Sequence, residues 1–270
     1  MIRRIPNSIL GTSEPNPMWF GNPGNEAGNP HWTHPNWLKS RFHFSFAEYN
    51  NLHNTGFGVL RVLNDDLVQP KRGFGEHPHA NMEICTYVVE GQLTHRDSMG
   101  TEETLSRGAI QFMTAGRGVR HQEHNLHQSA PLRFLQIWIT PRRTGLNPNY
   151  GSAACPPESR LNQWGHMVSD VENPSAQTAV KINQDANIFA TEVEAGRTVT
   201  MEMVAGRQGY LVCVESSAAV SFGGKDSTTL ERHDAAEVYG GGALTVEAVG
   251  EKAHLLLIEM AHTGHGRTDL

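Results

Sequence analysis

Two short histidine-containing motifs hold the residues best suited to chemistry. The first is HPH, with His77 and His79, and the second is HQE, with His121 and Glu123. In each motif the two candidate side chains are spaced i, i+2, and on a β-strand such residues point to the same face. Two such strands side by side would direct three imidazoles and one carboxylate at a single point. That donor set suits a divalent transition metal and leaves room for water or substrate.

The sequences of the segments around the motifs are typical of β-strands. Short apolar runs, among them residues 58–64, 83–90 and 132–140, are separated by Gly, Asn and Asp about every ten residues. This pattern is typical of an all-β sandwich or barrel. Regular helix is hard to place, and the best short candidate is 168–177. We therefore expect an all-β fold with little helix, in which two neighbouring strands carry the motifs.

Changes in composition divide the chain. The first 40 residues are rich in Pro, Gly, Asn and Trp, which predicts an irregular arm whose tryptophans (Trp19, Trp32 and Trp37) dock on an apolar surface. Several prolines and no periodic apolar face predict a linker near residue 150. The expected parts are the N-terminal arm (1–40), an N-terminal metal-binding β domain (41–140), the linker (141–165) and a C-terminal β domain (166–270).

Charge and composition exclude several classes of protein. The formal net charge is −6 and no basic run is present, which argues against direct binding of nucleic acid. No apolar stretch reaches transmembrane length, and the N-terminus lacks the apolar segment of a signal peptide. Three cysteines fit free thiols in a reducing compartment. These features predict a cytoplasmic protein that does not bind membranes, with a monomer as the expected state.

The residues around both motifs resemble the two sequence motifs of the cupin superfamily. The first cupin motif has HxH, then a Glu a few residues later, then a Gly. Its counterparts here are His77, His79, Glu83 and Gly91. The second motif ends with a His and, four residues later, an Asn, which His121 and Asn125 match. Thr114 departs from the pattern, because it stands where the second motif usually has Pro.

Within the cupins, the chain resembles the pirin family. The resemblance is carried by GFGVLRVLNDD (56–66), by residues 73–100 and by QFMTAGRGVRHQEHN (111–125), and more weakly by 135–139. Pirins are bicupins whose C-terminal cupin lacks metal. The resemblance therefore implies two jelly-roll-like cupin barrels packed together. Independently of it, residues 166–270 contain no HxH and no HxE, so no metal is expected in the C-terminal domain.

The resemblance also implies a cofactor: one mononuclear iron, Fe(II), in the N-terminal barrel. Its ligands would be His77, His79, His121 and Glu123. Glu83 is the rival carboxylate, because it shares strand parity with the HPH histidines and the matching Glu is often the ligand in other cupins. In pirins the ligand is the Glu two residues after the third His, which leaves Glu83 a hydrogen-bonding or structural role. The same donor set accepts Ni, Cu, Co, Mn or Zn.

Two functions follow from the resemblance. One is an iron-dependent dioxygenase similar to quercetin 2,3-dioxygenase, in which Glu123 is a metal-bound general base for a small aromatic chelating substrate, a flavonol. The other is a regulatory protein, a nuclear transcription cofactor in eukaryotes, whose Fe(II)/Fe(III) state changes the surface shown to a protein partner. An enzyme needs a closed apolar cavity, and a regulator needs an accessible charged surface beside the metal. A third interpretation is a different metal-dependent dioxygenase or an isomerase, because proteins with the same fold catalyse different reactions.

For several further side chains the sequence leaves two interpretations open. Phe44, Phe74, Phe112 and Trp138 could line a cavity around the metal, although packing in the core is the default for each. His95 and Asp97 share a strand face and are expected to be structural or rim polar groups. Cys85 shares strand parity with Glu83 and could lie near the pocket, although a small buried core residue is expected.

Overall fold

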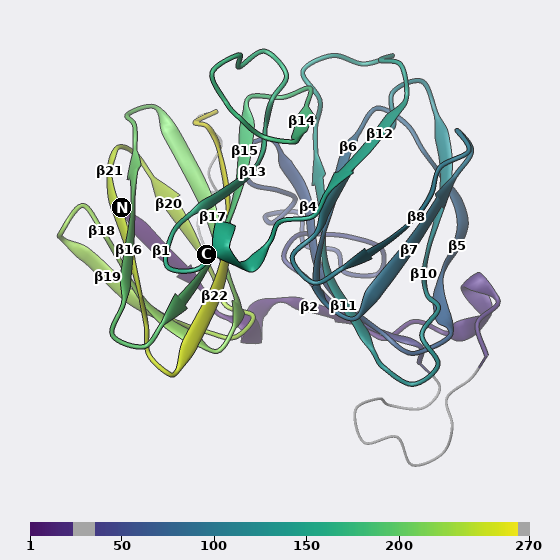
Figure 1. Cartoon of the computed structure of the whole chain (residues 1–270), viewed down its shortest axis with the longest axis horizontal. Coiled ribbons are helices and arrows are strands. Elements are labelled where there is room, and N and C mark those ends of the chain that lie inside the picture. The colour runs from purple at the N-terminus through teal and green to yellow at the C-terminus, as the bar shows by residue number, and fades with distance from the viewer. Residues whose placement is uncertain (24–35, 264–270) are drawn as a thin grey trace. The chain divides into compact units, whose positions relative to one another are not determined.

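The computed structural model describes residues 1–23 and 36–263, and this part of the chain is nearly all strand (Figure 1). Three short 3-10 turns are present, at Asn7–Ile9, Pro17–Phe20 and Pro157–Ser159. The expected all-β fold with little helix is confirmed. The helix candidate at 168–177 is wrong, because its first residues belong to strand β13 (Gly165–Asp170) and are paired on both edges. No helix among the described residues is long and apolar enough to cross a membrane.

The chain forms two compact units. The N-terminal unit comprises Gly11–Gly56 and Leu60–Ala154. The C-terminal unit comprises Met1–Leu10, Phe57–Val59 and Cys155–Leu270. Each unit contains one seven-stranded and one four-stranded sheet, so both halves of the chain have the two-sheet β architecture that the sequence predicts.

The N-terminal unit carries the two histidine motifs on its smaller sheet. In sheet order, the larger sheet is β12 (Asn149–Ala153), β9 (Ile110–Thr114), β6 (Glu83–Glu90), β11 (Leu132–Ile139), β4 (Leu60–Val68), β3 (Leu38–Phe42) and β2 (Gly11–Ser13). The smaller sheet is β5 (Arg72–His79), β10 (Val119–Asn125), β7 (Gln92–Asp97) and β8 (Glu102–Ser106). HPH ends β5 and HQE lies within β10, and the two strands are antiparallel neighbours. The predicted pairing of the motifs is therefore confirmed.

The C-terminal unit repeats this arrangement. Its larger sheet is β1 (Ile2–Ile5), β20 (Ala235–Tyr239), β17 (Arg207–Glu215), β22 (Lys252–Ala261), β15 (Ala186–Glu194), β13 and β14 (Val180–Ile182). Its smaller sheet is β16 (Thr198–Met203), β21 (Gly242–Ala248), β18 (Ser217–Phe222) and β19 (Asp226–Glu231). Apolar side chains from both sheets, among them Leu211, Val220 and Leu257, form one buried core.

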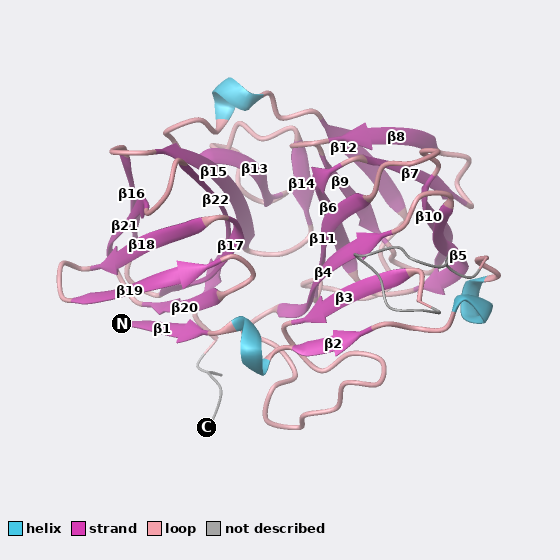
Figure 2. Cartoon of the chain, turned by 90° about the horizontal axis from the view of Figure 1, so that it is seen from below, coloured by secondary structure: helices cyan, strands magenta, loops and turns pink. Residues whose placement is uncertain are grey.

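The first 40 residues differ from the expected irregular arm. Strand β1 pairs with β20 at an edge of the C-terminal unit, and β2 pairs with β3 at an edge of the N-terminal unit (Figure 2). Both strands are short, so their pairing to an existing sheet edge, and not their own patterning, decides their conformation. Trp37 is fully buried and Trp19 is exposed, whereas Trp32 lies outside the described residues.

The expected linker also contains ordered structure. Within 141–165, strand β12 pairs with β9 and extends the larger sheet of the N-terminal unit. Its sequence, NYGSA, is mostly polar, as suits an edge strand, and shows no apolar alternation. The boundary between the two units lies at Ala154 and Cys155, inside the predicted linker.

Candidate metal centre

The pairing of β5 with β10 sets His77 directly opposite His121. Next along the ladder, His79 lies opposite Val119, and in the other direction Glu123 lies opposite Phe74. The register shifts between His121 and Glu123, because β5 has one residue more than β10 there. Alternation along β10 buries His121 and Glu123 and turns Arg120 outward. The i, i+2 spacing therefore places the candidate ligands as the sequence predicts.

The three histidines converge on one point. The Nε2 atoms of His77 and His121 are 3.1 Å apart, and the centroid of the His79 ring is 4.8 Å from each of the other two. His77 Nδ1 is 2.7 Å from the carbonyl oxygen of Gly75, so Nδ1 carries the hydrogen and Nε2 presents a lone pair. At this distance His121 Nε2 either donates a hydrogen bond to the His77 lone pair or shares a cation with it. The geometry therefore fits a bound metal ion.

Burial keeps the imidazoles of His79 and His121 neutral. Burial first, and then the neighbouring histidines, lower the pKa of His121 to about 2. Burial and then His77 lower the pKa of His79 to about 4. A metal binds only the neutral form, so neither ring needs to lose a proton to a cation at neutral pH.

Glu123 is held between the two sheets of the N-terminal unit. Its side chain is buried, 2 % exposed, on the smaller sheet. Its Oε1 accepts hydrogen bonds from Thr86 Oγ1 (3.1 Å) and Gln111 Nε2 (2.9 Å), and its Oε2 accepts one from Gln136 Nε2 (2.7 Å). Burial raises the pKa of Glu123, whereas His95, His77 and the hydrogen bonds act to lower it.

The three donors to Glu123 come from one row across the larger sheet. Gln136 on β11 lies opposite Thr86 on β6, which lies opposite Gln111 on β9. In the other direction Gln136 lies opposite Asn64 on β4. Because side chains opposite one another in adjacent strands share a face, the row presents these polar groups together to the interior. The sequence alone does not reveal this row, since its members lie far apart in the chain.

His95 lies beside the candidate metal ligands. It is opposite Glu123 on β7, and it forms a second potential metal group with His121 and Glu123 in which the nitrogen and oxygen ligand atoms all lie within 4.8 Å of one another. His77, His79 and His121 form the first such group. The four predicted ligands thus fall into two overlapping groups that share His121. His95 is fully buried, so of the two expected roles, structural or rim, only the rim position is wrong for it.

Two neighbours fix the orientation of His95. Its Nε2 is 3.0 Å from Oδ2 of Asp97, whose side chain is also buried. Its ring stacks on Tyr150 of β12, with centroids 4.5 Å apart and an interplanar angle of 21°. The Tyr150 hydroxyl lies 2.8 Å from Glu103 Oε2 and 3.0 Å from Gln111 Oε1, and its single hydrogen is shared between these two acceptors. The segment expected to be a linker therefore supports the candidate centre.

Glu83, the rival carboxylate, begins β6 and is completely buried. Its Oε2 accepts a hydrogen bond of 2.9 Å from Thr114 Oγ1. Among the described residues Glu83 belongs to neither potential metal group. Both groups lie in the N-terminal unit, and the described part of the C-terminal unit, which ends at residue 263, has none.

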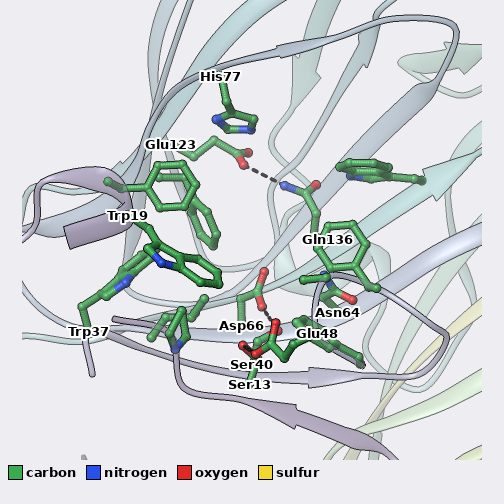
Figure 3. Close-up of a pocket in the computed structure, with 18 of the residues that line it drawn as sticks. Ser13, Trp19, Trp37, Ser40, Glu48, Asn64, Asp66, His77, Glu123 and Gln136 are labelled. Atoms are coloured by element: carbon green, nitrogen blue, oxygen red, sulfur yellow. Dashed lines mark hydrogen bonds between the residues drawn. The ribbon is translucent and has the colours of Figure 1, made fainter. Parts of the chain in front are cut away.

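A cavity of about 210 Å³ opens beside the histidines (Figure 3). Its walls are largely aromatic, and His77, His79, Glu123 and Gln136 contribute polar groups on one side. Phe74 and Trp138 line this cavity, as one interpretation of the sequence predicted. Phe44 and Phe112 do not line it and are core residues. Cys85 is also a buried core residue, as expected. The remaining aromatic and apolar walls are Trp19, Phe20, Trp37, Leu38, Phe42 and Phe46.

Comparison with known proteins gives matches over both halves of the chain. Residues 26–139 match the family model described as Pirin, and residues 171–260 match the model described as the quercetinase C-terminal cupin domain. A pirin-like protein of Caulobacter vibrioides is 37 % identical over 83 % of this chain and 93 % of its own length. The quercetin 2,3-dioxygenase of Escherichia coli strain K12 is 34 % identical over 82 % of this chain and 90 % of its own length.

A solved structure matches nearly the whole fold. The crystal structure of bacterial pirin YhhW from Escherichia coli in complex with nickel(II) superposes with a TM-score of 0.78. The match covers 97 % of this chain and 99 % of that chain, with 27 % sequence identity. The fold, including both cupin units, is therefore shared along the full length of that protein.

Proposed function

This chain belongs to the pirin family, and we propose that it is a mononuclear iron protein that acts as a flavonol 2,3-dioxygenase, the quercetinase reaction. The observation that carries the proposal is that three imidazoles, and a buried carboxylate grouped with one of them, His121, lie at the polar side of a largely aromatic cavity. Relatives named quercetin 2,3-dioxygenase and a nickel(II) complex of a structural neighbour support it.

The proposed ligands are His77, His79, His121 and Glu123. The donor set suits a divalent ion of the first transition row, and Fe(II) is the ion we propose. When bound, the metal would accept a chelating pair of oxygens and supply the electron transfer that O₂ chemistry requires. We propose that the C-terminal unit binds no metal.

Glu123 is the proposed general base. Its raised pKa brings it nearer to the acidity of a phenolic or enolic hydroxyl, which favours proton transfer from the substrate to a carboxylate oxygen. Thr86, Gln111 and Gln136 keep the carboxylate oriented, so that it need not reorganise as the proton arrives. The aromatic walls would sandwich a planar substrate and so shield it from water.

Oxygen consumption tests this proposal. Protein loaded anaerobically with Fe(II) is mixed with quercetin and O₂, beside the variants Glu123→Gln and Glu83→Gln. We expect uptake that requires iron, falls by at least about 100-fold in Glu123→Gln, and survives in Glu83→Gln. No uptake by protein shown to contain iron would refute the enzymatic function.

The second candidate function is redox-dependent binding of a protein partner. One observation favours it: on the outer side of the two ligand strands, exposed Arg120 and Glu76 form an ion pair of 2.8 Å beside the histidines. A charged surface so close to the metal is what such a switch would need. Partner binding that differs between Fe(II) and Fe(III) protein, without O₂ uptake, is the result that would favour this function.

A further inference from the structure

The cavity beside the histidines has a second polar region, which the metal chemistry does not use. Figure 3 shows it across the cavity from His77 and Glu123. We call this region the acidic pole, and it consists of Ser13, Ser40, Glu48, Asn64 and Asp66. Its residues come from β2, β3, β4 and the loop that follows β3.

Strand register builds the acidic pole. Ser13 lies opposite Ser40, and Ser40 lies opposite Asp66. Asn64 precedes Asp66 by two residues and faces the same way, next to Gln136 across the strand pair β4 and β11. Gln136 donates a hydrogen bond to Glu123, the proposed base. The side chain of Gln136 therefore separates Asn64 from that base. Two residues of an extended strand span about 7 Å, so Asp66 lies about this far from Asn64 along β4.

The acidic pole presents acceptors. Ser40 Oγ donates to Asp66 and Ser13 Oγ donates to Glu48, so both hydroxyl hydrogens are already used inside the pole. Burial raises the pKa of Asp66 to about 8, so this carboxyl is largely neutral at pH 7 and brings little charge to the pole. The neutral Asp66 carries one hydroxyl hydrogen of its own, and the other free oxygens of the pole, Asn64 Oδ1 among them, are acceptors.

Asn64 gives the strongest indication of a ligand. Its side chain is 4 % exposed and lines the cavity, and its Oδ1 has no hydrogen-bond partner within the described part of the chain. A buried amide oxygen without a donor costs about 1–3 kcal/mol. A ligand hydroxyl that donates to this oxygen would remove that cost, whereas a ligand without the hydroxyl would leave it in place.

We propose that the acidic pole binds the phenolic hydroxyls at the far end of the substrate, while the near end chelates at the histidines. The ligand class is therefore a flat aromatic molecule with a chelating oxygen pair at one end and a hydroxyl donor at the other. The proposal rests on the proposed function for the position of the chelating end. It makes Asn64 and Glu48 determinants of substrate specificity.

The test compares two flavonols that differ in one distal hydroxyl. Kaempferol carries a 4′-hydroxyl and galangin does not, and neither has a catechol that could bind the metal in a reversed orientation. Their affinities are measured by isothermal titration with zinc-loaded protein, which does not turn over. We expect wild-type protein to bind kaempferol about 10-fold more tightly than galangin, because an unmet buried acceptor disfavours the analogue that lacks the donor.

Two variants separate recognition from structure. In Asn64→Leu and in Glu48→Ala we expect the preference for kaempferol to fall below about 3-fold while galangin affinity stays within about 2-fold of wild type. Glu48 is exposed, so its variant carries little risk to folding. A purely structural role would weaken both flavonols equally and leave their ratio unchanged.

The outcomes distinguish this inference from the proposed function. Equal binding of both flavonols to wild type, or a preference that persists in both variants, overturns the role of the acidic pole and leaves the dioxygenase proposal standing. Failure of zinc-loaded protein to bind either flavonol overturns both. A preference that both variants abolish supports the inference.

Discussion

Gln136 Nε2 donates a 2.7 Å hydrogen bond to Glu123 Oε2, and this contact joins the two sheets of the N-terminal unit at the candidate metal centre. The Oε1 atom of the same amide lies 2.9 Å from Thr86 Oγ1, whose single hydroxyl hydrogen is shared between Gln136 and Glu123. Gln136 thus uses its donor and its acceptor to orient the proposed base. It lies on the central strand β11, where strands on both sides limit its movement.

The first prediction concerns this contact. Replacing Gln136 by Leu should weaken metal binding by roughly 10–100-fold, the usual effect of losing a group that orients a ligand. It should also lower the free energy of unfolding by about 1–3 kcal/mol, since Thr86 and Glu123 lose a partner in the interior. Competition with a chromogenic chelator measures the affinity. Gln122→Leu is the matched control, because Gln122 points to the other face of β10, and an equal loss there would contradict the prediction.

The second prediction concerns the ligand strand. His121→Ala should abolish stoichiometric metal binding and leave the β-sheet circular dichroism intact, because the strand keeps its pairs on both sides. His124→Ala removes an imidazole from the same strand on the opposite face, and it should retain full metal content. Metal analysis after anaerobic Fe(II) loading and gel filtration gives the readout. Stoichiometric iron in His121→Ala would remove this histidine from the ligand set.

Strand parity explains how much of the site could be read from the sequence. His77, His79, His121 and Glu123 form two i, i+2 pairs, and alternation alone determines that each pair shares a face. The donor set that the two pairs make together indicated that the two strands lie side by side. Both halves of the fold followed from apolar runs and turn residues. These features are local, so one sequence contains them.

The rest of the site depends on contacts between distant strands. Gln111 and Gln136 look like ordinary polar residues, and only the register of β9, β6 and β11 brings them to Glu123. The edge strands β2 and β12 carry little periodic pattern, yet they supply Ser13 and Tyr150. Parity did place His95 with Asp97. Nothing local showed that His95 would lie opposite Glu123.

The third prediction contrasts two adjacent acids on β4. Asp65 is buried and binds Arg133 through two hydrogen bonds of 2.8 and 2.7 Å, so Asp65→Asn should cost about 3–5 kcal/mol of unfolding free energy. Asp66 faces the cavity, and burial raises its pKa to about 8. Asp66→Asn keeps a neutral side chain of the same shape, so its effect at pH 5 should stay within about 1 kcal/mol. Denaturant unfolding measures both variants.

The pH dependence of the Asp66 variant has a definite sign. The folded protein keeps the Asp66 proton up to about pH 8, whereas the unfolded chain releases it near the ordinary value of 3.8. The folded state therefore binds more protons between these values, and wild-type stability from this group falls as the pH rises from 4 to 8. Asp66→Asn should gain stability relative to wild type over that range. A relative loss would show that Asp66 is ionised in the folded protein.

The fourth prediction decides between the two candidate carboxylate ligands. Glu123→Gln should lower metal affinity, because an amide oxygen binds a divalent cation less strongly than a carboxylate and the new amide hydrogens would face the donors Thr86, Gln111 and Gln136. Glu83→Gln should leave metal affinity within about 3-fold of wild type, because Glu83 is outside both groups of potential ligands. Titration of each variant with Fe(II) under anaerobic conditions gives the ranking of the two affinities.

The stability of each variant is measured as well, since both side chains are buried and each accepts a hydrogen bond from a threonine. A loss of affinity in Glu83→Gln, with Glu123→Gln unaffected, would assign the ligand to the first cupin motif and leave Glu123 a structural role between the sheets.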